Sequence, residues 1–536
     1  MAMMGMQSER RVVLGVMLMA LLIIGALNLG SAKAVWWVST YRGPPTYISS
    51  AELGHTNWNK TYGGFRIEVA YSVIQTSDGG YAIAGYTTTY GAGKHDFWLV
   101  KTDSTGNLEW SRTYGGPESN EEAYSVIQTS DGGYLIAGEK SDGDGEEDFW
   151  LVKTDSAGNL EWSRTYGGSG GDVARSVIQT SDGGYVIAGY TNSYGAGGFD
   201  FWLVKTDSAG NIEWSKTYGG PEWDLAKGPV IQTSDGGYVM AGYTRSYGAG
   251  EGDFWLVKTD SAGNLEWNKT YGGPREEVAY SVIQTSDGGY VMAGYTESYG
   301  AGIHDFWLVK TDSAGNLEWS KAYGGPKVDV AYSVVQTSDG GYLIAGYTNS
   351  YGAGGFDFWL VKTDSSGNIE WSRTYGGPKS DEARSVIQTL DGGYAVVGLT
   401  QSYGAGMADF WLIKILHPTF PLKVCVTGAI GQLLSSAKVD LLWENNTLFK
   451  TKNTNIDGYV YFEAPLGNFK IKVEYKGLTQ TRTIYINEPK TVYISLDIFL
   501  EIFGTPLTTT QTALLVGTSI IAVAAIIYII IKKLLH

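Results

Sequence analysis

Hydrophobic and polar residues follow a pattern that returns along most of the chain with a nearly constant period. The clearest unit covers 280–325 and contains Ser-Val-Ile-Gln-Thr, Asp-Gly-Gly, Tyr-Val-Met-Ala-Gly-Tyr-Thr, Asp-Phe-Trp-Leu-Val-Lys-Thr and Leu-Glu-Trp. The aspartate of its Asp-Gly-Gly turn recurs every 51–53 residues, at Asp78, Asp131, Asp182, Asp235, Asp287, Asp339 and Asp391. A period of this length is typical of a propeller, a solenoid or another repeat array.

Each unit predicts four β-strands. Strand A is Ser-Val-Ile-Gln-Thr, and an Asp-Gly-Gly turn, in which glycine accepts a positive φ, joins it to strand B, Tyr-Val-Ile-Ala-Gly-Tyr-Thr. Strand C is Asp-Phe-Trp-Leu-Val-Lys-Thr and strand D is Leu-Glu-Trp-Ser-Lys-Thr-Tyr, with an Asx-type turn, Asp-Ser-x-Gly-Asn, between them. Strands B and C are almost continuously apolar, which is typical of a sheet covered on both faces, such as a propeller blade between two others.

The number of strands predicts how the repeat closes. The A–B–C triplet and the strand D tryptophan each occur seven times, but Trp58 precedes the first triplet and no strand D follows the last, which ends at Lys414. We therefore predict an all-β fold in which 58–415 form a seven-bladed β-propeller and the N-terminal strand completes the last blade. This pairing would remove two free sheet edges. An open β-solenoid is the alternative, although its coils usually repeat every ~20–30 residues.

The segment Thr-Asp-Ser-x-Gly-Asn-x-Glu-Trp resembles the tryptophan-docking motif of quinoprotein-like propellers, in which the tryptophan packs between adjacent blades. Gly106 precedes Trp110 by the four residues of the family pattern, whereas Asp103 lies one residue closer to the tryptophan than in the family. The resemblance implies a fold, but it does not imply an enzyme activity. The sequence has none of the adjacent-cysteine pairs of the quinone-dependent alcohol dehydrogenases. Members of this group that act as assembly or binding scaffolds are the better comparison.

A second pattern, of short alternating strands with glycine turns, covers 421–497. It includes Gly428, Ala437-Lys-Val-Asp-Leu-Leu442, Asp457-Gly458, Phe462 and Pro465-x-Gly467-x-Phe469. These residues resemble the carboxypeptidase-regulatory-like family, a small transthyretin-like β-sandwich. The resemblance implies a spacer or an adhesion unit, which is how such modules usually serve on surface proteins.

The two ends of the chain predict export and membrane anchoring. Arg10 and Arg11 precede an apolar run, and a small-x-small cleavage site follows it, so we predict a secretory signal peptide over 1–34. Residues 512–531 are uncharged and long enough for a transmembrane helix, and Lys532 and Lys533 place the tail 532–536 in the cytoplasm. We expect 35–57 to be a lead-in and 498–511 to be a stalk.

Charge and composition narrow the function further. The net charge of −16 argues against a nucleic-acid partner, because such a partner needs a basic surface. The single cysteine, Cys425, lies in a strand pattern, and we expect a buried, unreactive thiol there. An exported chain with one cysteine has no internal disulfide and depends on burial for its stability.

The seven copies differ most from one another in two connections. The A–B and C–D turns hardly vary, whereas the D–A connections and the B–C loops do, and these two emerge on the same face of an up-and-down blade. Loops on a rigid scaffold often carry binding residues, so we predict a ligand face; drift in exposed loops is the alternative. We assign to this face Lys94, His95, Glu146, Phe199, Trp223, Arg275 and Lys327.

One position of the D–A connection is acidic in every copy: Glu68, Glu121, Asp172, Asp224, Glu277, Asp329 and Asp381. The aspartate that opens strand C is also invariant and is expected on the same side. Hard cations favour oxygen ligands, so these acids are candidates for binding Ca²⁺ or a cationic ligand. The alternative, which the perfect repetition favours, is that each carboxylate accepts N–H bonds from the backbone.

No catalytic motif stands out. The five histidines are scattered, and neither a His-Glu-x-x-His pair nor a P-loop occurs. The leading hypothesis is a non-enzymatic, single-pass cell-surface protein that binds an extracellular glycan, polymer or surface protein through several similar weak sites. An extracytoplasmic envelope-assembly scaffold is one alternative, and an extracytoplasmic hydrolase or quinone-dependent oxidoreductase is the other. We expect no cofactor apart from Ca²⁺ at the acidic positions.

Overall fold

The computed structural model describes residues 56–141, 146–416, 419–443, 448–465, 467–486, 489–498, 500–502 and 505–514, with Thr518 and Ile521. The predicted signal peptide, nearly all of the lead-in, most of 512–531 and the tail 532–536 lie outside these residues. Within them, no helix has both the length and the apolar character needed to cross a membrane. The described chain is all-β, which confirms the predicted fold class.

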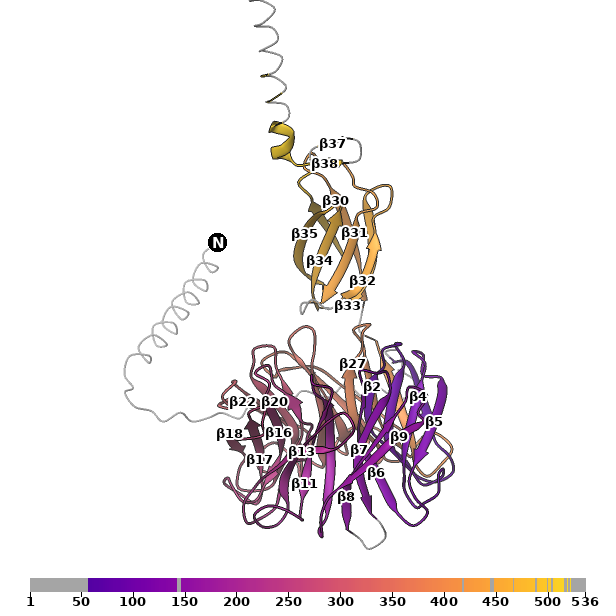
Figure 1. Cartoon of the computed structure of the whole chain (residues 1–536), viewed down its shortest axis with the longest axis vertical. Coiled ribbons are helices and arrows are strands. Elements are labelled where there is room, and N and C mark those ends of the chain that lie inside the picture. The colour runs from indigo at the N-terminus through magenta and orange to yellow at the C-terminus, as the bar shows by residue number, and fades with distance from the viewer. Residues whose placement is uncertain are drawn as a thin grey trace, which may run out of the picture. The chain divides into compact units, whose positions relative to one another are not determined.

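Residues 56–415 form seven antiparallel sheets, one for each copy of the repeat (Figure 1). The first three sheets contain β2 (Glu68–Gln75), β3 (Tyr81–Thr87), β4 (Asp96–Thr102) and β5 (Leu108–Tyr114); β6 (Asn120–Gln128), β7 (Tyr134–Ser141), β8 (Glu147–Thr154) and β9 (Leu160–Tyr166); and β10 (Asp172–Gln179), β11 (Tyr185–Thr191), β12 (Asp200–Thr206) and β13 (Ile212–Tyr218). In the fourth sheet, strand A is broken into β14 (Asp224–Leu225) and β15 (Ile231–Gln232), followed by β16 (Tyr238–Thr244), β17 (Asp253–Thr259) and β18 (Leu265–Tyr271).

The remaining three sheets repeat the same order of strands. They contain β19 (Glu277–Gln284), β20 (Tyr290–Thr296), β21 (Asp305–Thr311) and β22 (Leu317–Tyr323); β23 (Asp329–Gln336), β24 (Tyr342–Thr348), β25 (Asp357–Thr363) and β26 (Ile369–Tyr375); and β27 (Asp381–Gln388), β28 (Tyr394–Thr400), β29 (Asp409–Ile415) and β1 (Thr56–Tyr62). Strands B, C and D follow the predicted segments. Strand C is buried along its whole length in β4, as expected of a sheet covered on both faces.

Strand A begins earlier than predicted. We expected it to start at Ser72 in the first copy, but β2 starts at Glu68. Its register against β3 shifts between Ala70 and Ser72, and this β-bulge leaves Tyr71 without a partner in the ladder. The bulge interrupts the alternation that a strand prediction depends on. The acidic position that we placed in the D–A connection is therefore part of strand A, as its first residue in six copies and its second in β6.

The N-terminal strand β1 occupies the strand D position of the seventh sheet, as predicted. Its residues Trp58 and Tyr62 face Lys414 and Phe410. The covalently continuous first sheet has the same register, in which Trp110 faces Lys101. A strand from the start of the repeat tract thus substitutes for the missing one and covers an edge that would otherwise be open.

The seventh sheet also packs against the first. Phe410 and Leu412 of the seventh sheet share one hydrophobic cluster with Val73 and Trp98 of the first. The N–H of Leu390 donates to Gln75 Oε1 at 2.8 Å, and the N–H of Ser77 donates to Gln128 Oε1 at the same distance between the first and second copies. The junction between the last copy and the first is therefore built like the others, and the repeat is a β-propeller.

In six of the seven copies the strand D tryptophan lies against the glycine of the C–D turn in the next copy; the seventh copy has no such turn, so Trp371 of the sixth has no glycine partner of this kind. A Cβ on Gly106 would lie 2.4 Å from Trp58 Cζ3, and a Cβ on Gly158 would lie 2.7 Å from Trp110 Cζ3. The Tyr62 hydroxyl also donates to the Gly106 carbonyl at 2.7 Å. Glycine is needed at this turn because its φ is positive and because the indole ring fills the space of a side chain.

Residues 419–498 contain two further sheets with a core of their own. One sheet pairs β30 (Thr419–Thr427) with β33 (Tyr459–Pro465) and β36 (Lys490–Ser495), and the other orders β32 (Leu448–Asn453), β31 (Lys438–Trp443), β34 (Gly467–Tyr475) and β35 (Leu478–Ile486). The side chains of both sheets form one hydrophobic cluster, and Cys425 is buried as expected. The predicted stalk contains a short hairpin, β37 (Leu500–Ile502) and β38 (Thr505–Leu507), and Ile498 belongs to the core.

Candidate ligand-binding sites

The variable connections meet in pairs at the junctions between copies. The N–H of Glu121 donates to the His95 carbonyl at 3.0 Å, and the N–H of Asp329 donates to the His304 carbonyl at 2.9 Å. In both cases the end of a B–C loop holds the start of strand A in the next copy. We call the B–C loops together with the D–A connections the rim. The two connections do lie on the same side of the sheets.

The seven residues predicted for the ligand face lie on the rim, distributed over five of the junctions between copies. Lys94, Glu146, Trp223, Arg275 and Lys327 are exposed, and His95 and Phe199 are half-buried. The structure brings one pair of them together: the Phe199 ring meets the Trp223 ring edge-on, with 5.9 Å between the centroids. His95 stacks on Tyr86 and contacts Glu122 at 2.9 Å, so part of its surface is already occupied. Ligand binding by these residues stays a prediction.

The acidic position of strand A is completely buried in every copy. The exposed fraction is 0% for Glu68, Glu121, Asp172, Asp224, Glu277, Asp329 and Asp381. In the sixth copy, Asp329 Oδ2 accepts the N–H of Gly325 at 2.8 Å, and its other oxygen accepts the hydroxyl of Thr348. These are the backbone contacts that the alternative interpretation expected, together with hydroxyl donors that the sequence did not reveal.

Each buried acid of strand A faces the aspartate that opens strand C in the preceding copy. The two carboxylates flank the first glycine of the Tyr-Gly-Gly segment: a Cβ on Gly324 would lie 1.8 Å from Asp305 Oδ1 and 2.8 Å from Asp329 Oδ2. Burial, with a smaller contribution from the Asp329 charge, raises the pKa of Asp305 to about 6. Among the described residues, no three His, Cys, Asp or Glu side chains come together as metal ligands would. Binding of Ca²⁺ by the acids stays a prediction.

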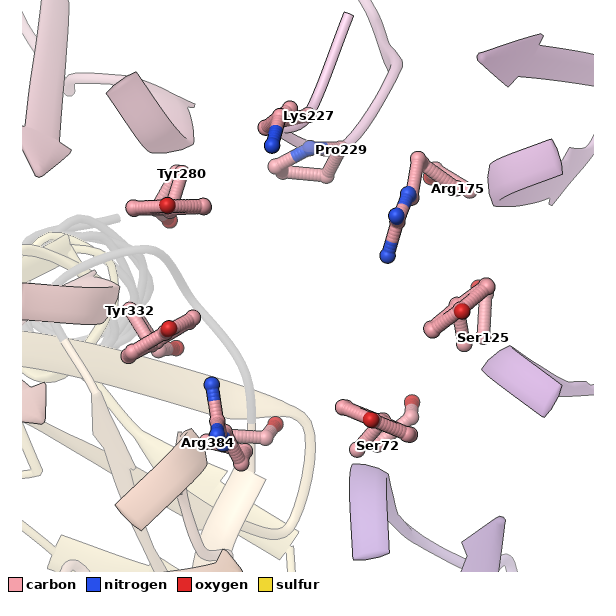
Figure 2. A pocket seen from close by; sticks show the side chains of 14 residues that line it. Ser72, Ser125, Arg175, Lys227, Pro229, Tyr280, Tyr332 and Arg384 are labelled. Carbon is pink, nitrogen blue, oxygen red and sulfur yellow. The ribbon is translucent and has the colours of Figure 1, made fainter. Parts of the chain in front are cut away.

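A cavity of about 400 Å³ lies where the A strands of all seven copies converge (Figure 2). Its wall contains the residue that follows the invariant alanine of strand A in each copy: Tyr71, Tyr124, Arg175, Lys227, Tyr280, Tyr332 and Arg384. A lower tier of the same lining consists of serines, such as Ser72 and Ser125. The Ser72 hydroxyl accepts the N–H of Val126 at 3.3 Å, so this tier also links one copy to the next.

The bulge of strand A directs these side chains into the cavity. The register shifts at Tyr71, Tyr124, Arg175, Tyr280, Tyr332 and Arg384, so each of these residues is the unpaired extra residue of its strand. A bulge bends the strand and re-aims a side chain, which is why bulges often occur beside functional sites. The bulge therefore positions the same wall residue in six of the copies.

The fourth copy departs from the repeat at this wall. Its Lys227-Gly228-Pro229 replaces the Tyr-Ser of other copies and adds one residue. Proline has no N–H for the ladder, so strand A stops at Leu225 and resumes at Ile231. The break leaves Lys227 and Pro229 on a loop that forms part of the cavity wall.

The three cations of the wall have different surroundings. Arg384 Nη2 lies 2.5 Å from Glu382 Oε2, and its guanidinium lies 4.2 Å from the centroid of the Tyr332 ring. Arg175 stacks on the Tyr124 ring at 3.9 Å and donates to the Tyr190 hydroxyl at 2.9 Å. Arg175 therefore has aromatic and hydroxyl partners where Arg384 has a carboxylate.

Lys227 lies beside aromatic rings and another cation. Its Nζ is 5.7 Å from the Tyr243 ring centroid and 5.9 Å from that of Tyr280, and no described residue accepts a hydrogen bond from it. Burial, and then the neighbouring Arg175 charge, lower its pKa to about 8. The nearby Glu276 is itself bound to Arg245 at 2.8 Å and to the Tyr295 hydroxyl at 2.6 Å.

Our sequence reasoning did not identify the cavity. The signal lay in strand A, where the residue after the invariant alanine is Tyr, Tyr, Arg, Lys, Tyr, Tyr and Arg in the seven copies. Strand A is otherwise nearly the same in all copies, but this one position is a cation in three of them. The variation therefore lies within a strand and not in a loop. Comparing the copies position by position within the strands would have found them.

Comparison with known proteins gives distant likenesses. No family model matches this chain. The regulatory protein FlaEY of Caulobacter vibrioides is 27% identical over 213 residues, in a match that covers 34% of this chain and 22% of that protein. The chain thus spans less than a quarter of the length of this relative.

Several solved β-propeller-like structures resemble the chain at low identity. A fungal alcohol oxidase in complex with copper is 12% identical, with a TM-score of 0.40 over 80% of this chain and 99% of that chain. Drosophila Plexin A in complex with Semaphorin 1b is 8% identical, with a TM-score of 0.40 over 67% and 88%. Sqt1 from Chaetomium thermophilum is 13% identical, with a TM-score of 0.38 over 64% and 82%.

Proposed function

We propose that the chain is a non-enzymatic, membrane-anchored cell-surface binding protein, in which a closed seven-bladed propeller presents the rim to an extracellular glycan. One observation carries the proposal. At six of the seven junctions, a backbone hydrogen bond joins the end of a B–C loop to the end of the D–A connection in the next copy, such as Phe199 with Asp224 and Gly252 with Glu277. The rigid sheets thus hold a set of different loop pairs side by side.

Large apolar side chains are exposed on the rim. Phe65 is 69% exposed and Met407 is 64% exposed, and their loops touch where the Met407 N–H donates to the Arg66 carbonyl at 2.7 Å. Trp223 is 48% exposed and carries Arg245 over its ring at 5.5 Å. Exposed aromatic rings beside hydrogen-bonding groups suit the flat faces and hydroxyl groups of sugars. Exposure of large apolar side chains to water is unfavourable, and a ligand that covered them would remove this exposure.

Anchoring and export are supported by the sequence of the two ends, through the predicted signal peptide over 1–34 and the apolar segment over 512–531. Display of several loop pairs on one molecule would let weak individual contacts add up on a polymeric glycan. A ligand with one repeating sugar unit could contact more than one junction.

A glycan and surface-protein array probed with the full-length chain in detergent micelles tests the proposal. We expect selective binding to glycans, and we expect Trp223→Ala together with Phe65→Ser to weaken it at least tenfold. Leu390→Ser is the matched control, because Leu390 is 60% exposed in the A–B turn, away from the rim. Binding to surface proteins alone would overturn the glycan assignment. Silence of the whole array, or equal losses in rim and control variants, would overturn the proposal.

A further inference from the structure

We propose that the central cavity binds a small organic oxyanion, a sugar or acid bearing a carboxylate, sulfate or phosphate group, with the anionic group between Arg175 and Lys227. This inference concerns a site that the rim proposal does not use. Figure 2 shows the side chains of Arg175, Lys227 and Arg384 entering the cavity from three different copies. These three charges have different partners.

The chain supplies a counter-ion for one of the three cations. In the seventh copy the sequence is Glu382-Ala-Arg384, and the glutamate two residues before the arginine pairs with it at 2.5 Å. In the third copy the same position is Val173, before Arg175, and in the fourth it is Leu225, before Lys227. Neither Arg175 nor Lys227 forms an ion pair with a described side chain. Two neighbouring cations thus share a half-buried wall without an ion-paired carboxylate, although the Glu139 charge acts on Arg175 and the Glu276 charge acts on Lys227.

Arg175 is held in place and still has an N–H group without a hydrogen-bond partner. Stacking on Tyr124 and the bond to Tyr190 fix the plane of its guanidinium group. Its Nε is buried and has no hydrogen-bond partner among the described residues, as is also true of Arg384 Nε, so the missing carboxylate is what distinguishes Arg175. A buried donor without a partner is costly, and an immobilised guanidinium group presents two parallel N–H bonds that match an oxyanion. A ligand anion in the cavity would give this guanidinium group the charged acceptor that Arg384 has in Glu382.

Lys227 completes the anion site from the adjacent copy. Arg175 and Lys227 line the same cavity from adjacent copies, and burial together with repulsion by the Arg175 charge lowers the pKa of Lys227. An anion between them would replace this repulsion with two attractions. The tyrosines of the wall, including Tyr280 and Tyr332, offer aromatic faces and hydroxyl groups to the body of the ligand. The volume of about 400 Å³ suits one or two sugar rings or an acid of similar size.

Isothermal titration of the full-length chain with glucuronate, glucose 6-phosphate, inorganic phosphate and glucose tests the inference. We expect at least one of the two organic anions to bind and glucose not to bind. Arg175→Gln and Lys227→Met should each weaken binding at least tenfold, which is the usual effect of losing a charge-assisted hydrogen bond. Binding of inorganic phosphate as tightly as the sugar acids would contradict the organic ligand, and failure of all three anions would overturn the site.

Adding a counter-ion beside Arg175 gives a more specific test of the inference. Val173→Glu places beside Arg175 the carboxylate that Arg384 already has, so it should abolish anion binding while the cavity keeps its arginine. Val173→Gln has the same size without the charge and should retain binding, and both variants should unfold at similar temperatures. If Val173→Glu binds the anion as well as Val173→Gln does, the inference is wrong. Array binding at the rim is measured separately, so each proposal can fail without the other.

Discussion

Gly324 illustrates how one residue of the repeat is fixed by its neighbours. Its Cβ position is filled by two carboxylates, those of Asp305 and Asp329, which come from adjacent copies. Equivalent contacts occur at Gly115, Gly167, Gly219, Gly272 and Gly376, and at Gly63 between the seventh and first copies. The glycine of Tyr-Gly-Gly is thus required by what lies beside it and not by a positive φ.

Replacing this glycine tests the contact. Gly324→Ala should lower the free energy of unfolding by about 1–3 kcal/mol, because the added methyl group must displace a buried carboxylate. Gly252→Ala is the matched control and should cost less than about 1 kcal/mol, because the nearest atom would lie 3.4 Å from its Cβ. Urea titration of both variants measures the difference. Equal effects at the two positions would show that the carboxylate pair does not constrain Gly324.

The same carboxylate pair predicts an unusual dependence of stability on pH. The pKa of Asp305 is raised to about 6 by burial and by Asp329, and that of Asp357 is raised to about 6 by burial and by Asp381. An unfolded aspartate ionises near pH 4, so between pH 4 and 6 the folded state binds more protons. These groups therefore make the protein more stable as the pH falls from about 7 to about 4.

Asp305→Asn should remove that dependence at one junction. The asparagine oxygen can still accept the N–H groups of Ala301 and Gly302, and the amide can donate toward Asp329. We expect the free energy of unfolding at pH 7.5 to rise by about 1–2 kcal/mol, with a flatter profile down to pH 4.5. Denaturant titrations at several pH values measure this. A loss of stability at pH 7.5 would contradict the argument.

Asp312→Asn provides a control of opposite sign. Asp312 lies in an exposed C–D turn, where the side chain and backbone N–H of Asn316 lower its pKa. A lowered pKa gives stability that is present above the ordinary value and lost as the pH falls through the folded value. The control variant should therefore gain nothing at pH 7.5.

At the scale of elements, β1 is the strand that completes the sheet of the seventh copy. Scrambling 56–62 should cost at least about 3 kcal/mol, because Trp58 loses its contact with Gly106 and Tyr62 leaves the cluster it shares with Phe410. Replacing the segment with Leu-Glu-Trp-Asn-Lys-Thr-Tyr, the sequence of β18, should be tolerated, because β1 and β18 have the same register with their partner strands. Thermal unfolding distinguishes the two variants. If both unfold alike, the closing strand contributes little.

The elements also show what could be predicted from sequence. Strands B, C and D and the closing role of β1 follow from apolar runs, turn residues and a count of tryptophans. The first half of strand A was missed because the bulge at Tyr71 breaks its alternation, and the break in strand A at Pro229 was missed because a single copy carries it. The acidic positions could be predicted from their repetition in the sequence. Their burial could not, because it depends on contacts with a neighbouring copy.

At the scale of the whole molecule, the cavity could not be predicted from any one copy. Tyr71 or Arg175 alone is an ordinary strand residue, and a wall arises when seven A strands are brought around one space. The rim could be predicted because the variation of each loop is visible when the copies are compared along the sequence. The cavity could not, because its wall is formed by residues from all seven copies together. This is why the predicted face and the cavity contain different residues.

Residues 419–498 should fold independently of the repeats. Their hydrophobic cluster draws its members from 422–498, and the clusters of the repeats draw theirs from 56–415. A chain that ends after Leu416 should keep the unfolding temperature of the repeats within about 1 °C, which corresponds to less than about 1 kcal/mol. Calorimetry of the full chain should show two transitions and the shortened chain one. A large drop in the remaining transition would show that the two regions depend on each other.

The pairing of β1 with β29 has a consequence for how the protein is made. Trp411 Nε1 donates to Asn59 Oδ1 across 352 residues of sequence, and a ribosome synthesises the first of these partners long before the second. The earliest strand to emerge must wait, unpaired, until the last repeat has been translated. A product that terminates anywhere between them therefore carries an unmatched strand at its start, and quality-control factors that bind exposed β-edges would detect it as unfinished.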